Sequence, residues 1–161
     1  MKGRALALLA QREHSTAEMR RKLQRHAAAD PPADPAAGGV DDVEEVLAWL
    51  RAHNYLSEER FVECRVHQRA ARHGSLRIKQ ELAQHGLALT PEAAQALRDS
   101  ELARATEVWR RKYGQPPASA AERARQSRFL AGRGFSAETI ARVMRDAGRA
   151  EADPEPGTDF D

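Results

Sequence analysis

One short pattern occurs three times in this chain: a turn, a serine and a short helical stretch with two apolar residues four apart. The serines and their apolar pairs are Ser15 with Met19 and Leu23, Ser75 with Ile78 and Leu82, and Ser136 with Ile140 and Met144. A spacing of four places each pair on one face of a helix. Each copy follows a longer basic helix, so the pattern predicts about three units that stack into an elongated, curved body.

Unrelated capped helices would be the simpler explanation of this similarity. Against it, Leu9–Ser15 and Leu130–Ser136 share Leu-x-x-Arg-x-x-Ser in the same register. Only 5% of the 161 residues are aromatic, whereas good helix formers abound. The sequence therefore predicts an all-α protein of tandem three-helix repeats.

The expected division is a first repeat at 1–56, a second at 57–99, a third at 100–149 and a disordered acidic tail at 150–161. The first repeat contains a Pro/Ala/Gly-rich segment, 27–40, that we expect to be a mobile linker.

Helix ends are predicted from capping residues. Ser15 with Glu18 and Ser119 with Glu122 have the spacing of capping boxes. The other start signals are Ser57, flanked by the apolar Leu56 and Phe61, and the pair Thr90-Pro91. The expected ends are near His14 for the first helix, at Gly74 with positive φ for the long middle helix, at Gly86, and near Gly148 for the last helix.

Charge is segregated along the chain, although 26 basic and 24 acidic residues nearly balance. Residues 1–26 carry seven basic and two acidic side chains, and 27–50 carry acids without Lys or Arg. The net charge alone therefore does not imply nucleic-acid binding. The short apolar stretch at the N-terminus, the single Cys64 and the lack of a long apolar run lead us to expect a cytoplasmic protein without membrane contact.

Four blocks, in order, resemble the RecX family of bacterial regulators of the RecA recombinase: LLAQREHSTAEMRRKL, VLAWLRAHNYLSEERFVECRV, HGSLRIKQELAQHGL and FLAGRGFSAETIARVM. The resemblance covers roughly residues 3–147. Three mild departures are Met19 in place of Leu, Glu58 or Glu59 in place of Asp, and Ser75 in place of Pro.

The resemblance implies three tandem three-helix repeats in a molecule that lies in the groove of a RecA–DNA filament. It also implies repression of the recombinase, ATPase and coprotease activities of RecA, and hence modulation of homologous recombination, DNA repair and the SOS response. We expect a monomer with at most weak, sequence-independent DNA binding. The alternative is a helical DNA-binding regulatory protein.

The residues give little support to catalysis. No G-x-x-x-x-G-K-[ST] motif is present to cradle phosphates, so we expect a non-enzyme without a cofactor. Glu63, Cys64 and His67 could supply half of a zinc site, but the sequence offers no second ligand pair, and Cys64 is interpreted as a small buried residue.

Basic side chains are the best candidates for binding RecA or DNA. They are Arg12, Arg20, Arg21, Arg25, Arg65, Arg69, Arg72, Arg77 and Lys79. Arg65, Arg69 and Arg72 have the spacing of one helical stripe, with an ordinary solvated face as the alternative. Arg110, Arg111 and Lys112 are explained by helix-dipole compensation, Trp109 as core and Trp49 as the flank of an apolar stripe.

Overall fold

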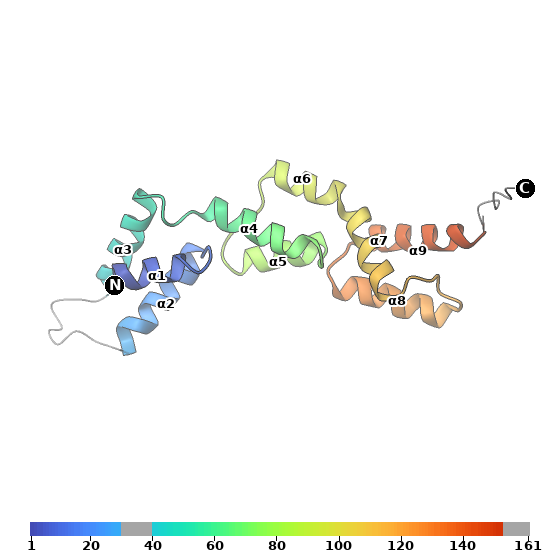
Figure 1. Cartoon of the computed structure of the whole chain (residues 1–161), viewed down its shortest axis with the longest axis horizontal. Helices are drawn as coiled ribbons and strands as arrows, with labels where there is room; N and C mark the ends of the chain where they lie inside the picture. The colour runs from blue at the N-terminus through green and yellow to red at the C-terminus, as the bar shows by residue number, and fades with distance from the viewer. Residues whose placement is uncertain (30–39, 153–161) are drawn as a thin grey trace, which may run out of the picture. The chain divides into compact units, whose positions relative to one another are not determined.

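The structure is a computed structural model that describes residues 1–29 and 40–152. In this part of the chain every regular element is a helix, from α1 to α9, and no strand occurs (Figure 1). The prediction of an all-α protein is confirmed. The predicted acidic tail lies mostly outside the described residues, as does most of the predicted linker.

The first of two compact units comprises residues 1–66 and 81–88. Its helices are α1 (Lys2–Leu9), α2 (Thr16–Ala29), α3 (Val40–Ala52) and the beginning of α4 (Glu58–Ala70). Helices α2 and α3 pack together through a buried cluster that includes Met19, Leu23, Val43, Leu47 and Leu50. The apolar pair of the first motif copy thus forms part of a core, as its spacing predicts.

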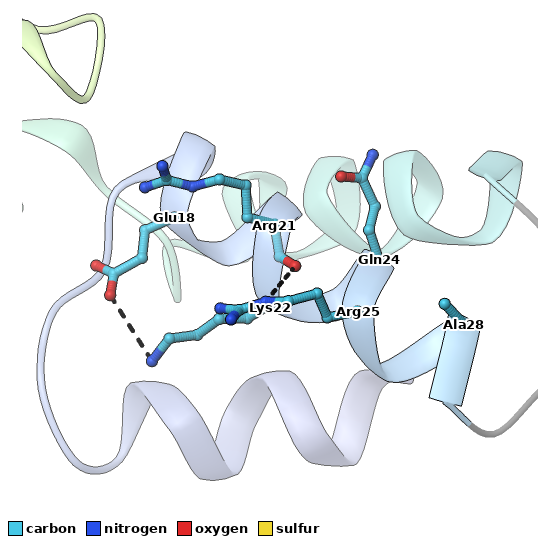
Figure 2. A pocket seen from close by; sticks show the side chains of 6 residues that line it. All are labelled: Glu18, Arg21, Lys22, Gln24, Arg25 and Ala28. Carbon is cyan, nitrogen blue, oxygen red and sulfur yellow. Dashed lines mark hydrogen bonds and ion pairs between the residues drawn. The ribbon is translucent and has the colours of Figure 1, made fainter.

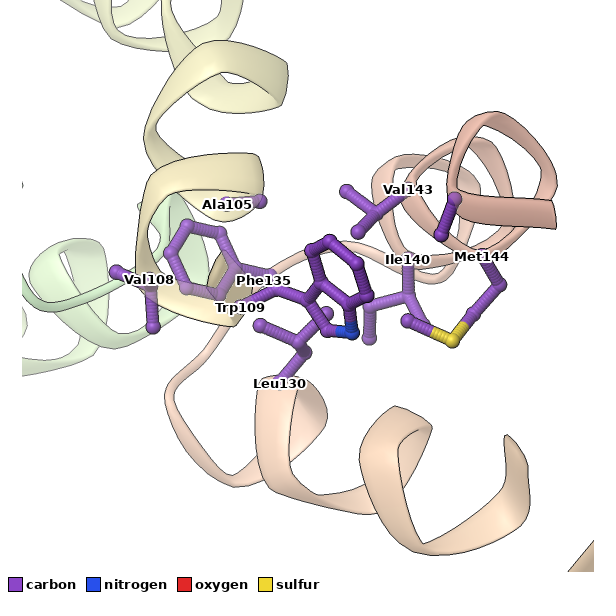
Figure 3. Packing of buried hydrophobic residues seen from close by; sticks show 9 residues of the cluster. Ala105, Val108, Trp109, Leu130, Phe135, Ile140, Val143 and Met144 are labelled. Carbon is purple, nitrogen blue, oxygen red and sulfur yellow. The ribbon is translucent and has the colours of Figure 1, made fainter. Parts of the chain in front are cut away.

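The second unit comprises residues 67–80 and 89 onward. It holds most of α5 (Ser75–Ala83), together with α6 (Pro91–Asp99), α7 (Glu101–Lys112), α8 (Ala120–Gly132) and α9 (Ala137–Ala152). Helix α9 packs on α7 and α8. Figure 3 shows Trp109 in the middle of this core, with Leu130 of α8 and Ile140 of α9 beside it. The indole Nε1–H of Trp109 donates to Gln126 Oε1 at 2.7 Å, which satisfies its polar group in the interior.

Several predicted helix starts are confirmed by hydrogen bonds. The hydroxyls of Ser15, Ser57, Thr90, Ser119 and Ser136 each accept a backbone N–H three residues later. Both capping boxes are only half formed, however. The Glu18 carboxylate binds Arg12 and Lys22, and the Glu122 carboxylate accepts from the Ala118 N–H.

Two predicted helix ends and both ends of the predicted linker are wrong. Helix α1 ends at Leu9, and α9 continues past Gly148 to Ala152. Ala27, Ala28 and Ala29 belong to α2, and Val40 to α3, so helix extends into both ends of the predicted linker. Alanine is the best helix former, and the helix-breaking signal starts only at Pro31.

The middle helix α4 ends at Ala70, four residues before Gly74. Arg104 provides the reason, because its guanidinium Nη1 donates to the carbonyls of Ala70 at 3.0 Å and His73 at 2.7 Å. These are carbonyls that a continuing helix would occupy with its own N–H groups. The predicted positive φ at Gly74 is wrong, because Gly74 does not have a positive φ angle. Positive φ angles occur instead at Gly86, Gly114 and Gly134, with values of 72°, 68° and 85°.

Candidate partner-binding surfaces

Two of the predicted binding residues are engaged in ion pairs within the first unit. Arg12 forms a two-pronged contact with the Glu18 carboxylate, and its Nη1 also donates to the Glu13 carbonyl at 3.0 Å. Arg20 Nε donates to Glu44 Oε1 at 2.6 Å, which joins α2 to α3. Both guanidiniums are already directed at carboxylates, so they are weaker candidates for partner contact than the sequence suggests.

Arg21 and Arg25 have a different position on α2, where both are exposed. With Lys22 and Gln24 they line an open hollow of about 610 Å³, to which Glu18 and Ala28 also contribute (Figure 2). We call this the α2 hollow. It brings three cations and one carboxylate together, so it favours an anionic partner group.

A buried histidine supports one wall of the α2 hollow. His14 is 1% exposed, its Nδ1 lies 2.8 Å from the Arg12 carbonyl, and its Nε2 lies 2.9 Å from Lys22 Nζ. Because a lysine ammonium can only donate, Nε2 accepts and the proton sits on Nδ1. Burial lowers the pKa of His14, and the Arg12 and Lys22 charges act in the same direction. The neutral ring therefore fixes the Lys22 ammonium beside the hollow.

The motif serine of this unit makes a second contact. Ser15 Oγ lies 2.8 Å from Nδ1 of His85, and the pKa of His85 is lowered chiefly by burial. The His85 ring also contacts Phe61, with centroids 4.9 Å apart. Ser15 thus ties the start of α2 to the segment after α5, which sequence spacing does not reveal.

Only two residues of the predicted stripe, Arg65 and Arg69, lie on α4 one turn apart. Arg72 follows the end of α4, and Arg65 belongs to the first unit while Arg69 and Arg72 belong to the second. The Arg65 guanidinium lies over the Phe61 ring, 5.1 Å from its centroid. Of the last two predicted residues, both exposed, Arg77 Nη1 donates to the Gly132 carbonyl at 3.3 Å, whereas Lys79 lies on α5.

A second hollow, of about 340 Å³, lies within the second unit. Its lining combines four cations, Arg72, Arg111, Lys112 and Arg133, with Ala71, Val108 and Phe129. We call it the Phe129 hollow. Arg72 is the only one of the nine predicted residues among its lining. The sequence prediction missed Arg111, Lys112 and Arg133, although residues 104–133 carry eight basic and only two acidic side chains.

Cations and aromatic rings alternate at this hollow. The Arg133 guanidinium lies 5.2 Å from the centre of the Phe129 ring, which meets Tyr113 edge-on at 5.5 Å. On the other side, Arg125 lies 5.9 Å from the centre of the Tyr113 ring. Arg111 Nε donates to Glu107 at 2.8 Å, which holds its guanidinium at the last turn of α7. Arg111 and Lys112 also line the Phe129 hollow, and helix-dipole compensation does not explain this position.

The structure corrects the interpretation of Cys64, which is exposed rather than buried. Within residues 1–29 and 40–152, no group of three His, Cys, Asp or Glu side chains has a geometry that could hold a metal ion. Trp109 is a core residue as predicted, and Trp49 flanks the first core, stacked on His53 and Tyr55. None of the described helices has both the length and the apolar character that a membrane crossing requires.

The helices and their basic hollows define an all-α protein built of tandem three-helix repeats. Three stretches match the models of the RecX family: residues 2–36 match its first three-helix domain, 57–89 its second and 99–144 its third. The chain belongs to the RecX family. The predicted resemblance is thereby confirmed.

Curated relatives match along most of the chain. A protein of Ralstonia nicotianae named Regulatory protein RecX is 48% identical over 150 residues, which cover 91% of this chain and 87% of the relative. The protein of the same name from Leptothrix cholodnii is 51% identical over 150 residues, covering 90% and 87%. These names support a regulatory role for the family.

Proposed function

We propose that this protein is a non-enzymatic negative regulator of RecA. It binds the groove of the RecA–DNA filament and inhibits the recombinase, ATPase and coprotease activities. In this way it modulates recombination, DNA repair and the SOS response in the cytoplasm. The observation that carries the proposal is the match of all three RecX three-helix domains, in order, along one chain.

The repeat division at 1–56, 57–99 and 100–149 is part of this proposal. A protein made of successive units can contact more than one subunit of a filament, because each unit offers its own surface. The α2 hollow lies in the first unit and the Phe129 hollow in the second. Both are lined by more cations than acids, so each can receive an anionic group of a protein or of DNA.

Binding to the filament tests the proposal. RecA filaments assembled on single-stranded DNA with a slowly hydrolysed ATP analogue are sedimented with the full chain, in parallel with the DNA alone and RecA alone. The account predicts co-sedimentation with the filament at protein concentrations that leave the bare DNA unoccupied. Equal binding to filament and bare DNA would contradict it.

A second candidate function is a helical DNA-binding regulatory protein, which the exposed cations of residues 104–133 favour. It requires tight binding to duplex DNA with strong salt dependence. Six phosphate contacts would give a slope of log K against log salt concentration of about −5. The salt titration on duplex DNA therefore separates the two functions.

A further inference from the structure

We propose that the Phe129 hollow is a binding site for single-stranded nucleic acid, which takes one unstacked base and its flanking phosphates. This inference deepens the proposed function, because it assigns the DNA of the filament to one surface of the second unit. It rests on the chemistry of the hollow and on the charge around it.

The charge around the hollow fits a polyanion. Four cations from three different segments line it, and no carboxylate is among the lining residues, although Glu107 pairs with one of the cations, Arg111. Arg125 and Arg128 are exposed on α8, so the basic surface continues beyond the hollow. A short acidic peptide would need fewer cations, whereas a chain of phosphates is matched by cations spread over several turns of helix.

The apolar part of the hollow selects a single strand. Val108 and Phe129 are apolar residues of its lining, and the Arg133 guanidinium lies over the Phe129 ring. A base freed from its stack can lie against an aromatic ring or a guanidinium plane. Bases in a duplex are already stacked, so duplex DNA gains only the phosphate contacts.

Hydrogen bonds hold several of these cations in place. Glu107 accepts hydrogen bonds from Arg110 at 3.1 Å and Arg111 at 2.8 Å, which orients both side chains at the end of α7. Arg104 holds the turn after α4 through the Ala70 and His73 carbonyls, and this turn carries Arg72. The cations are thus presented from fixed backbone positions.

The test measures fluorescence anisotropy of a labelled 20-nucleotide single strand and of a matched duplex, with the full chain and three variants. Lys112→Gln removes a cation of the hollow, whereas Arg123→Gln is the matched control, an exposed cation outside it. Phe129→Leu keeps an apolar side chain but removes the ring. Circular dichroism and melting temperature establish that each variant folds.

We expect the wild-type chain to prefer the single strand. Lys112→Gln should weaken single-strand binding about three- to tenfold. It should also reduce the slope of log K against log salt concentration by about 0.7, the value for one phosphate contact on a single strand. Arg123→Gln should change affinity less than about twofold. Phe129→Leu should lower single-strand affinity about tenfold and leave duplex affinity unchanged, since only the single strand offers a base to stack.

Equal losses of single-strand affinity in Lys112→Gln and Arg123→Gln would overturn the proposal, since binding would then depend only on the total charge of the protein. Equal affinity of the wild-type chain for single strand and duplex would overturn it too. The RecA ATPase assay separates this inference from the proposed function. If the wild-type chain binds single strands through the hollow but never inhibits RecA, the inference stands and the proposed function fails. If it inhibits RecA without such binding, the proposed function stands and the inference fails.

Discussion

Gly74 and Gly134 cross so closely that a Cβ atom built on Gly74 would lie 2.2 Å from the carbonyl oxygen of Gly134. The two turns are also paired through their backbones. The Gly74 N–H donates to the Arg133 carbonyl at 2.9 Å, and the Leu76 N–H donates to the Gly134 carbonyl at 3.1 Å. These turns precede the second and third copies of the serine motif, so two copies of the repeated pattern are joined directly.

Gly74→Ala should therefore destabilise the protein by about 1–3 kcal/mol, the range for a forced contact in a packed region. Urea unfolding followed by circular dichroism measures the loss. Gly132→Ala is the control, because nothing lies within 4 Å of a Cβ at that position. A Gly74→Ala protein as stable as the Gly132→Ala protein would disprove the close crossing.

Glu101 connects the same two motif copies through its buried carboxylate. Oε1 accepts the Ser75 N–H at 2.8 Å, and Oε2 accepts the hydroxyls of Ser136 and Thr139, each at 2.8 Å. Glu101→Ala leaves these donors without the carboxylate and should cost about 2–4 kcal/mol, whereas the exposed Glu138→Ala should change stability by less than about 0.5 kcal/mol. Thermal and urea unfolding of both variants give the comparison, and equal effects would contradict the role of Glu101.

The same carboxylate predicts a response to acid. Burial would raise the pKa of Glu101, but the hydrogen bonds from Ser75, Ser136 and Thr139 outweigh burial and hold this pKa below its usual range. Its stabilising contribution is then present above the unfolded pKa of about 4.3 and is lost as pH falls through the lower folded pKa. Unfolding free energies from pH 6 to 3 should fall less steeply in Glu101→Gln than in the wild-type chain; parallel curves would refute this.

His14 predicts a separate response near neutral pH. Its lowered pKa means that the folded protein resists protonation of the ring, while the unfolded chain takes up the proton below about pH 6.5. Stability should therefore fall between pH 7.5 and 5.5. His14→Gln should reduce this fall, and the exposed His53→Gln should leave it intact. The same slope in all three proteins would remove His14 as its source.

Arg104 is predicted to be more important for stability than any exposed arginine. Besides the two carbonyls at the end of α4, it donates to the Leu97 carbonyl at 2.9 Å and to Ser100 Oγ at 3.1 Å. Arg104→Ala should cost about 2–4 kcal/mol, because three part-buried carbonyls lose a charged donor. Arg104→Lys should recover only part of this loss, since an ammonium cannot reach four acceptors in a fork. Urea unfolding that shows full stability in Arg104→Lys would contradict this geometry.

On α2, the exposed arginines of the hollow are predicted to bind the partner, whereas Arg20 has a structural role. Arg21→Ala with Arg25→Ala should weaken inhibition of RecA about tenfold and leave stability nearly unchanged, because both side chains are exposed. Arg20→Ala removes the pair with Glu44 and serves as a control that removes one positive charge from the same helix outside the hollow. ATPase inhibition curves for the two variants compare them. Similar curves would exclude the α2 hollow as the contact.

The fold could be predicted from the sequence where the signals are local. Spacings of four placed Met19, Leu23, Ile140 and Met144 in the cores, and serine hydroxyls marked the helix starts. Such signals need only residues one or two helical turns apart.

The remaining features depend on residues far apart in sequence. The end of α4 is fixed by Arg104, 34 residues from Ala70, and the need for Gly74 comes from Gly134 rather than from its own φ. For the same reason the Phe129 hollow escaped prediction, because Arg72, Lys112 and Arg133 become neighbours only in the folded unit. The local basic block at 104–133 was the one available signal.

The central claim is regulation of RecA, and ATP hydrolysis by the cognate RecA on single-stranded DNA tests it most directly. The full chain is titrated from far below one molecule per RecA to equimolar. The account predicts inhibition well below one molecule per RecA, because one bound regulator affects several subunits of a filament. Unchanged hydrolysis at every ratio, with the chain bound to the DNA alone, would contradict it.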